Sequence, residues 1–554
     1  MTYSPRKFAL SSTILIAAAL AGAASVVGVG KGVSTPENVI HAVPSTAART
    51  EATLGCPGAI LDPFTVSDAN QRAVPSMDTS PSDAQSHNQS ESPASSAAQS
   101  AMSGRAVEAP ASGAPVDRPM SARATSPMSG APMSGTPSAM SGADTRASGG
   151  DTAASGAQSG ALMWASTQPT RTWSPATSTL SGVRHSEGAP PTGAVIAGYG
   201  GGELRSLTIS GCKEAATEQY FAIGSTTLGE DLVLTLVNPS SLPTQVDITA
   251  FSSIGPISVP PLEITVPAGQ SAVVLPASWI VEEQHPVLKI AADGPGVVAW
   301  MQTSGMQGEL PLGTARVPST TPATQHVIPG LVPGKNATAR VFVPGPDPAH
   351  VTLSVSGEDA TVPLGGGEAD IDPQAALDIP IGSVPKGVSA LGVSSTVPVV
   401  VQVLHSGEGG AFASTTSTWG SRDGLSPSTP VTSARLPGST DMTAAVTQTL
   451  SAAPLRPTAQ QTASGVSEVN SSLSLTAPAD APATVTIGGT TLDIPAGATR
   501  QTPLPATSEN LSATVPIHVS VTLSATTPTG PLQASWPVGT PSAAVAAGTV
   551  LVND

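Results

Sequence analysis

Short apolar runs with period-two alternation recur in the same order three times after residue 230. A first run ends in proline at residues 236–239, 341–344 and 475–478, and a second run follows at 245–251, 350–356 and 483–488. In such runs alternate side chains face opposite sides of a sheet, with apolar residues toward the core and Thr or Ser toward water. Because the order repeats, the sequence predicts three related β-sandwiches.

A third run recurs at 262–269 and 492–497, and a last run at 297–302, 399–403 and 532–536. We therefore predict a mainly β fold of tandem immunoglobulin-like β-sandwich modules at 193–320, 321–422 and 423–554. One larger β-domain with accidental internal similarity is the alternative. Helical periodicity is not sustained over three turns in this half of the chain. The predicted cores are aliphatic, with Trp536 in the third, and the first includes Leu234, Leu236, Val246, Ile248 and Trp300.

The composition agrees with a turn-rich β protein. Gly and Pro contribute 55 residues each, whereas aromatic residues make up 3% and charged residues 11% of the chain. The formal net charge is −16, and the chain has no run of four or more Lys or Arg residues. Because a phosphate backbone needs a basic face, these numbers argue against a nucleic-acid partner. The spread of acidic residues indicates solubility.

The N-terminus predicts export. Arg6 and Lys7 precede 23 uncharged residues from Phe8 to Gly30. About 20 apolar residues are enough to cross a bilayer as a helix, and the positive flank keeps the N-terminal end in the cytoplasm. We therefore predict a signal anchor or signal peptide at 1–31. The protein is then either a single-pass protein of the cell membrane with its C-terminal bulk outside, or secreted if the signal is cleaved after the small residues 21–23.

The region behind the apolar run has a different character. Residues 73–192 contain no Ile, Phe or Tyr and only two Leu, and they repeat a Met-Ser-Gly motif. Such a segment cannot bury enough apolar surface to offset its ordering entropy. We predict a disordered low-complexity Ala/Ser/Pro/Gly/Met tract at 73–192. Residues 32–72 are predicted to be a short ordered segment that joins the first module through Cys56.

Cys56 and Cys212 are the two cysteines of the chain. An even number in an exported chain predicts one disulfide, with two free thiols as the alternative. A metal site is not predicted, because there is no Cys-x-x-Cys and no nearby His. If the two cysteines pair, both ends of the tract at 73–192 are held at one place, and the tract is a side loop instead of a stalk.

The motifs of common active sites are missing from the sequence. It has no Gly-x-Ser-x-Gly and no His-Glu-x-x-His, and its glycine runs at 198–202 and 365–367 are predicted to be turns. Three polar groups have residue types found in metal or catalytic sites, but solvated loops and strands explain them better: Glu282, Glu283 and His285; Glu368, Asp370 and Asp372; and His405, Ser406 and Glu408. We assign no catalytic, cofactor-binding or metal-binding residue and no cofactor.

A family resemblance rests on the Cys-Pro-Gly at 56–58, on Cys212, and on the strand patterns at 220–226, 232–239 and 266–269. In these features the chain resembles an uncharacterised family of exported actinobacterial proteins, domain of unknown function 5719. The resemblance covers about 53–420, interrupted by the low-complexity tract. It implies a location at the cell surface, a β-rich fold and no established activity, and it carries no catalytic residue over to this chain.

We therefore expect a non-enzymatic exported cell-envelope protein, whose β-sandwich modules bind an unknown protein or glycan partner and whose membrane contact is the run from Phe8 to Gly30. Two alternatives stay open. One is an envelope hydrolase or glycan-processing enzyme with a site assembled from dispersed residues. The other is an accessory subunit of a membrane glycosyltransferase or transporter.

Overall fold

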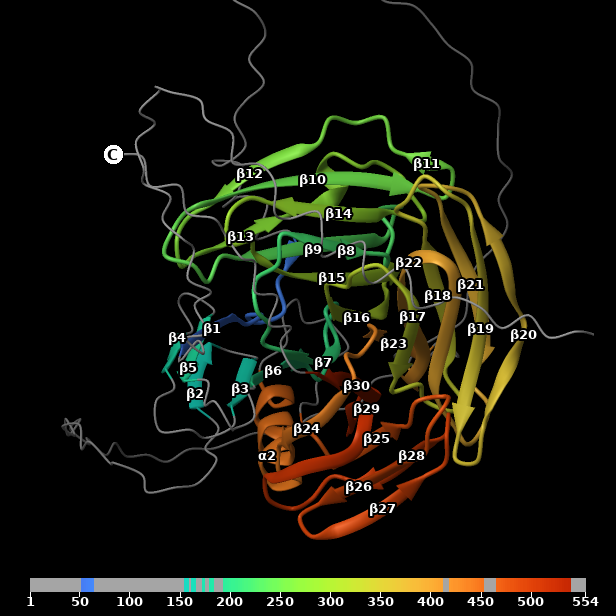
Figure 1. The fold of residues 1–554 in the computed structure, drawn as a ribbon. Helices are drawn as coiled ribbons and strands as arrows, with labels where there is room; N and C mark the ends of the chain where they lie inside the picture. Colours follow the sequence, from blue (N-terminus) through green and yellow to red (C-terminus); the bar gives the residue numbers. More distant parts are fainter. Residues whose placement is uncertain are drawn as a thin grey trace, which may run out of the picture. The chain divides into compact units, whose positions relative to one another are not determined.

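The computed structural model describes residues 51–63, 193–411, 418–452 and 465–539, together with four short strands between 154 and 183 (Figure 1). Its sheets pair antiparallel throughout these residues, so the prediction of a mainly β fold is confirmed. No helix in the described part is long and apolar enough to cross a membrane. The predicted anchor from Phe8 to Gly30 lies outside the described residues, as does most of the predicted tract.

Three sandwiches follow one another along the chain. Sandwich 1 consists of β8 (Glu218–Phe221), β9 (Glu230–Val237), β10 (Thr244–Ser252), β11 (Gly255–Pro256), β12 (Leu262–Val266), β13 (Ser271–Val274), the short helix η1 (Pro276–Ser278), β14 (Val287–Ala292), β15 (Val298–Gln307) and β16 (Leu310–Pro318). Sandwich 2 consists of β17 (Ala323–Pro329), β18 (Asn336–Phe342), β19 (Ala349–Gly357), β20 (Thr361–Ile371), β21 (Ala376–Ser383), β22 (Val388–Ala411) and β23 (Thr418–Leu425). Sandwich 3 consists of β24 (Val431–Leu436), α2 (Ser439–Leu450), β25 (Glu468–Thr476), β26 (Ala483–Ile487), β27 (Thr490–Ile494), β28 (Thr499–Pro503), β29 (Glu509–Thr527) and β30 (Gly530–Val538).

All three share one pairing order. In sandwich 2 the long strand β22 pairs with β17 and β19 near its start and with β18 and β23 near its end, while β20 pairs with β19 and β21 with β18. In sandwich 3 the long strand β29 has the corresponding partners β24, β26, β25 and β30. In sandwich 1 the long strand is divided into two. β14 pairs with β8 and β10, and β15 pairs with β9 and β16, which are the corresponding partners.

A proline marks the point where the long strand changes sheets. β22 pairs with β19 up to Ser395 and with β18 from Val400, and Pro398 lies between. Pro516 has the same place in β29, and Pro295 lies between β14 and β15. Proline has no N–H to donate to a ladder, so it is tolerated where neither sheet needs one.

The prediction for the last run of the third copy is wrong, because it picked a neighbouring strand. Residues 532–536 belong to β30, which pairs with β29 as β16 pairs with β15. The strand that corresponds to 297–302 and 399–403 is the second half of β29. Period-two alternation is the same in neighbouring strands, so it could not distinguish the two.

The core of sandwich 1 is aliphatic, as predicted, with one correction. Leu234, Leu236, Val246 and Ile248 belong to one buried cluster. Trp300 is also buried, but it belongs to a separate cluster with Val237 and Val298. On a strand, alternate residues face opposite sides, so Trp300 lies on the outward face of its sheet.

Two strands before sandwich 1 differ from the predicted module at 193–320. β6 (Gly193–Tyr199) and β7 (Ser206–Gly211) contribute Ala194, Ile196, Leu207 and Ile209 to the core cluster of sandwich 3. At the C-terminal end of β7, a Cβ on Gly211 would lie 2.5 Å from Nε1 of Trp536, so only glycine fits there. The prediction assigned β6 and β7 to the first module because they lie next to it in the chain. Their side chains instead pack into the core of sandwich 3.

Four strands lie inside the predicted disordered tract: β2 (Ala154–Gln158), β3 (Ala161–Ala165), β4 (Thr172–Ser174) and β5 (Thr179–Val183). β5 pairs with β1 (Glu51–Gly55), and β3 pairs with β6. The predicted tract therefore extends too far toward the C-terminus. The apolar content of this stretch is low, but its strands satisfy their backbone N–H and C=O groups by pairing with neighbouring strands. Composition does not reveal such pairing.

Helix α2 corrects the expectation that this half of the chain has no sustained helical pattern. Its buried residues, at spacings of three and four, form one face: Met442, Ala445, Val446, Thr449 and Leu450. That spacing is the helical signal. The glycines at 365–367 were likewise not a turn between strands, because they lie within β20, where the pairing to β19 is interrupted.

Candidate functional site

The disulfide prediction is confirmed: Cys56 and Cys212 are bonded, with Cα atoms 4.3 Å apart. The bond fixes a buried segment, residues 54–63, that we call the strap. Gln302 on β15 accepts a hydrogen bond from Leu61 N–H (3.0 Å) and donates one to Leu61 O (2.7 Å), so it pairs with the strap as another strand would. Arg316 on β16 donates to the carbonyls of Gly58 (2.7 Å) and Ala59 (2.5 Å). Burial lowers the pKa of Arg316 to about 10, so it remains a cation at neutral pH.

A second buried arginine joins the three sandwiches. The Arg205 side chain donates to Thr529 Oγ1 (2.7 Å), to Pro531 O (2.9 Å) and to Gly420 O, and its own carbonyl accepts from Thr314 N–H (3.0 Å). Burial lowers the pKa of Arg205 to about 9. Through its side chain and its backbone carbonyl, one residue ahead of β7 therefore contacts β16, β23 and the β29–β30 hairpin.

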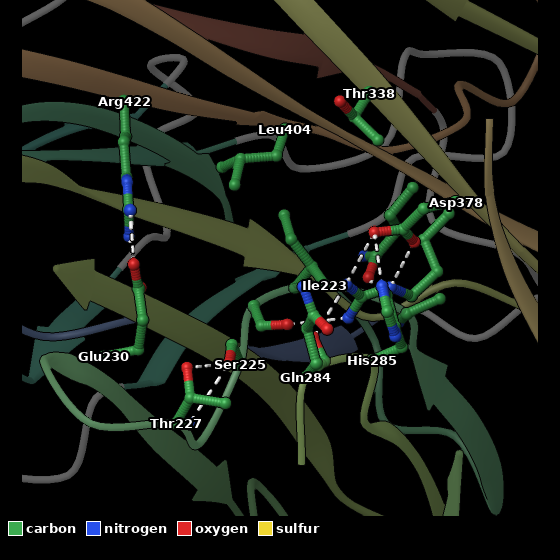
Figure 2. A pocket seen from close by; sticks show the side chains of 14 residues that line it. Ile223, Ser225, Thr227, Glu230, Gln284, His285, Thr338, Asp378, Leu404 and Arg422 are labelled. Atoms are coloured by element: carbon green, nitrogen blue, oxygen red, sulfur yellow. Dashed lines mark hydrogen bonds and ion pairs between the residues drawn. The ribbon is translucent and has the colours of Figure 1, made fainter. Parts of the chain in front are cut away.

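A cavity between sandwiches 1 and 2 has a volume of ≈ 290 Å³ (Figure 2). Arg340 on β18 forms a two-point ion pair with Asp378 on β21, at 2.6 and 3.0 Å. The same guanidinium donates to carbonyls of sandwich 1, at Gly224 (2.7 Å), Gln284 (3.3 Å) and Pro286 (3.3 Å). Figure 2 shows Asp378 beside His285, whose Nε2 lies 3.6 Å from Asp378 Oδ2.

The other side of the cavity has a matching clamp. Arg422 on β23 binds both carboxylate oxygens of Glu230 on β9, at 2.6 Å each. A Cβ on Gly305 would lie 2.6 Å from this guanidinium, so the glycine makes room for it. Gln402 is fully buried between the clamps, where it accepts from Ala222 N–H (2.9 Å) and donates to Pro318 O (2.8 Å).

These contacts decide what the cavity can do. Two-point arginine–carboxylate pairs are strong and geometrically specific, and here each joins or braces two sandwiches. Ser225 Oγ contacts Thr227 Oγ1 (2.8 Å) and Glu283 O (3.2 Å), and not the imidazole of His285. The arrangement holds the two sandwiches together.

A serine–histidine contact does occur between sandwiches 2 and 3. Ser428 Oγ lies 2.7 Å from His518 Nδ1, and Ser428 Oγ also donates to Val327 O (3.3 Å). Burial lowers the pKa of His518 to about 4. A general base works best with a pKa near the ambient pH, so this histidine is a poor base, and the contact is explained by packing.

The structure does not bring the three polar groups of the sequence together as sites. Glu283 Oε1 accepts from the backbone N–H of His285 (2.9 Å), while Glu282 is exposed. Asp370 pairs with His350 (2.8 Å) on the surface. No cluster of three His, Cys, Asp or Glu side chains in the described part of the chain could hold a metal ion.

His405 has an unexpected position. It is fully buried, and neither ring nitrogen has a hydrogen-bond partner among the described residues. Burial, and then the charge of Lys335, lower the pKa of His405 to about 3. Asp423 lies opposite His405 in the sheet, and burial raises the pKa of Asp423 to about 7. Ser406 points to the other face of the strand, so His405 and Ser406 do not converge, in agreement with the sequence analysis, which assigned no site to them. The Glu408 side chain is outside the described residues.

Comparison with protein families finds a match. The family of unknown function DUF5719 matches residues 165–464, which is 300 of the 554 residues. The chain belongs to this family. The DUF5719 region contains sandwiches 1 and 2, both arginine clamps, Cys212 and α2. It excludes Cys56, so it begins later and ends later than the expected 53–420. No curated protein matches the chain.

Sequence reasoning missed every residue that joins the sandwiches. A usable signal existed for two of them: Gln402 and Arg340 occupy outward positions of strands, between apolar neighbours. An outward polar residue on a strand indicates either water or a partner, and the sequence does not say which.

Proposed function

We propose that this chain is a non-enzymatic cell-envelope protein whose immunoglobulin-like modules bind a protein or glycan partner outside the cytoplasm. The observation that carries the proposal is the use of the buried charges. Arg205, Arg316, Arg340 and Arg422 all bind groups that join one part of the chain to another. A protein whose buried cations hold its parts together in this way presents fixed surfaces, as a binding module requires.

Two features support the location. Arg6 and Lys7 precede the uncharged run from Phe8 to Gly30, as in export signals. The buried disulfide between Cys56 and Cys212 suits an oxidising compartment. We propose a single-pass membrane protein with modules at 193–320, 321–422 and 423–554, corrected for β6 and β7, or its secreted form if the signal is cleaved.

The test is co-purification from cross-linked, detergent-solubilised membranes, together with protease digestion of intact cells. We expect the bulk of the chain to be accessible from outside and a specific partner to be enriched. Retention of the whole chain in the cytoplasm would contradict the proposal. Labelling of Ser428 by a fluorophosphonate would contradict it as well, and would favour the envelope hydrolase.

A further inference from the structure

Four asparagines of this chain are followed, two positions later, by Ser or Thr with no proline between: Asn88, Asn336, Asn470 and Asn510. In exported proteins this spacing is the acceptor pattern for N-linked glycosylation. Asn238 also has a serine two positions later, but Pro239 lies between them and the asparagine is buried. Asn88 lies outside the described residues. Because the pattern alone does not select a site, the surroundings of the other three asparagines decide.

Asn470 lies on β25 and its side chain is exposed. Alternate residues of a strand share a face, so Ser472, which completes the pattern, projects on the same side as Asn470. Glu468 lies on this side too, and its Oε1 accepts a hydrogen bond from Asn470 Nδ2 (3.0 Å). Burial decreases along this face from Ser474, which is fully buried where β17 and β22 of sandwich 2 contact β25, to Ser472, which is half-buried, and to Asn470. The Asn470 amide therefore lies beyond the part of the face that sandwich 2 covers, where a saccharide has room.

The backbone at Asn470 also has a free edge. Among the described residues, 468–471 pair with β29 on one side, whereas β28 pairs with β25 only from Ser472 onward. A transferase has to hold the acceptor segment as an extended peptide, and in a folded sheet this requires an open edge. Asn470 meets this condition.

The other two asparagines do not have such an edge. At Asn336, β18 pairs with β21 on one side and with β22 on the other. Asn510 pairs with Arg435 on β24, whose Nη1 donates to Asn510 Oδ1 (3.2 Å), and Ser512 of the same pattern pairs with both β24 and β26. The structure therefore separates Asn470 from two asparagines that the sequence pattern treats alike.

We propose that Asn470 is the acceptor of an N-linked glycan, which a membrane transferase delivers from a lipid-pyrophosphate-linked oligosaccharide. The amide nitrogen of Asn470 attacks the anomeric carbon of the first sugar. The carbon–nitrogen bond forms, the bond between this carbon and the pyrophosphate oxygen breaks, and the lipid pyrophosphate leaves. A base of the transferase takes the proton that the amide loses. The inference rests on the proposed function only for the location outside the cytoplasm.

A glycan at this position also has a structural consequence. The unpaired N–H and C=O groups of an edge strand are a template for pairing with another chain, and natural proteins cover or blunt such edges. A bulky, solubilising group on Asn470 covers the stretch of β25 that β28 leaves unpaired. The modification therefore protects the edge against association with a second copy.

The test uses the full-length protein purified from the envelope of the cells that produce it. After proteolysis, fragmentation mass spectrometry should find the peptide with Asn470 heavier by the mass of a saccharide and place that mass on the Asn470 amide. The peptides with Asn336 and Asn510 should have their unmodified masses. An unmodified Asn470, a saccharide at Asn336 or Asn510 alone, or a saccharide on the hydroxyl of Ser472 would overturn the proposal.

Matched variants of the pattern sharpen the test. Asn470→Gln should abolish the modification, and so should Ser472→Ala, because the pattern requires the hydroxyl. Ser472→Thr keeps the hydroxyl and should retain the saccharide. The control Ser471→Ala lies between the two residues of the pattern and should be modified as the wild type is. Retention of the saccharide in Ser472→Ala, or its loss in Ser471→Ala, would contradict the proposal. If Ser472→Ala is not recovered from the envelope, the exposed substitution Asn470→Gln decides.

Protease digestion of the intact cells separates this proposal from the proposed function. If the bulk of the chain is accessible from outside and Asn470 is unmodified, the acceptor site is refuted while the proposed location stands. If the chain is retained in the cytoplasm, the location and the acceptor site fail together. If Asn470 carries the glycan but no partner is enriched from membranes, the binding role fails and the acceptor site stands.

Discussion

Sandwiches 1 and 2 have the same strand pairing, but they bury the outward face of the corresponding sheet in different ways. Trp300 and Gln402 occupy matching positions, opposite Thr235 and Arg340, two residues before the ends of β9 and β18. The strap covers the face around Trp300, whereas sandwich 1 covers the face around Gln402. The fold therefore provides the same position in both sandwiches. The segment that covers this position determines whether an apolar side chain, as in Trp300, or a polar one, as in Gln402, is compatible with it.

The two covers also use different chemistry. Over sandwich 1, Arg316 and Gln302 bind backbone groups of the strap, and a disulfide fixes the strap covalently. Over sandwich 2, Arg422 binds the Glu230 carboxylate of sandwich 1, and Arg340, which is ion-paired with Asp378 of its own sandwich, donates to backbone carbonyls of sandwich 1. The first cover depends on a covalent bond, and the second depends on ionised groups, so the two should respond to different perturbations.

The largest effect is expected from Cys212→Ser, which releases one end of the strap. Loss of a native disulfide costs about 2–5 kcal/mol, and here it also uncovers Trp300. Denaturant unfolding followed by tryptophan fluorescence would measure the loss. Adding a reductant should cause the same loss of stability in the wild type and should not change the stability of the variant. Unchanged stability of the variant would show that the strap is no part of the cover.

The next effect depends on pH and concerns His405, whose position is occupied by Thr303 in sandwich 1 and by Leu523 in sandwich 3. In the unfolded chain the His405 imidazole has a pKa near 6.5, whereas in the folded protein its pKa is about 3. The folded protein therefore loses stability as the pH falls between these two values. In His405→Leu this loss should be absent, which favours the variant over the wild type by about 3 kcal/mol more at pH 4 than at pH 7.

The measurement for His405 is the difference in unfolding free energy between variant and wild type at the two pH values. Asp423, with its raised pKa, has the opposite pH dependence, since its stabilising protonated form appears as the pH falls below 7. That contribution is present in both proteins and largely cancels in the difference. The control is Thr303→Leu, at the corresponding buried position of sandwich 1, which removes no titratable group and should show no pH-dependent difference. A pH-independent effect of His405→Leu would disprove the burial argument.

A smaller loss is expected for Arg340→Met, which leaves Asp378 and the carbonyls of Gly224 and Pro286 without their donor. Breaking a buried ion pair costs about 3–5 kcal/mol, but Asp378 is a quarter exposed, so we expect about 2 kcal/mol. A double-mutant cycle with Asp378→Asn should give a coupling of similar size. Simple additivity of the two substitutions would exclude the clamp.

The smallest effect should come from Arg422→Lys, which keeps the charge and loses the two-point geometry with Glu230. We expect about 1 kcal/mol. The companion variant Arg316→Lys tests the other cover, where the two carbonyls of Gly58 and Ala59 accept from separate nitrogens. If raised salt weakens the two variants relative to wild type by the same amount, the proposed difference between the covers is wrong.

The sequence predicted the strands better than their partners. Alternation identified Leu234, Leu236, Val246 and Ile248 as core, because one face of each strand must be apolar. It could not tell that Trp300 faces outward, because an outward residue is apolar only when something covers it. The cysteine pair was predictable from number and compartment, whereas Arg340 and Arg422 were not, because their carboxylates lie far away along the chain.

The disulfide has a consequence for how the molecule breaks. Cys56 and Cys212 are 156 residues apart, and their bond makes a covalent ring of the chain between them. A protease that cuts one peptide bond in this ring opens it without dividing the molecule, so both pieces migrate together until a reductant is added. Under denaturing conditions, a cut beyond Cys212 separates a fragment without any reductant. More than a quarter of the chain can therefore be nicked without the loss of any part of the protein.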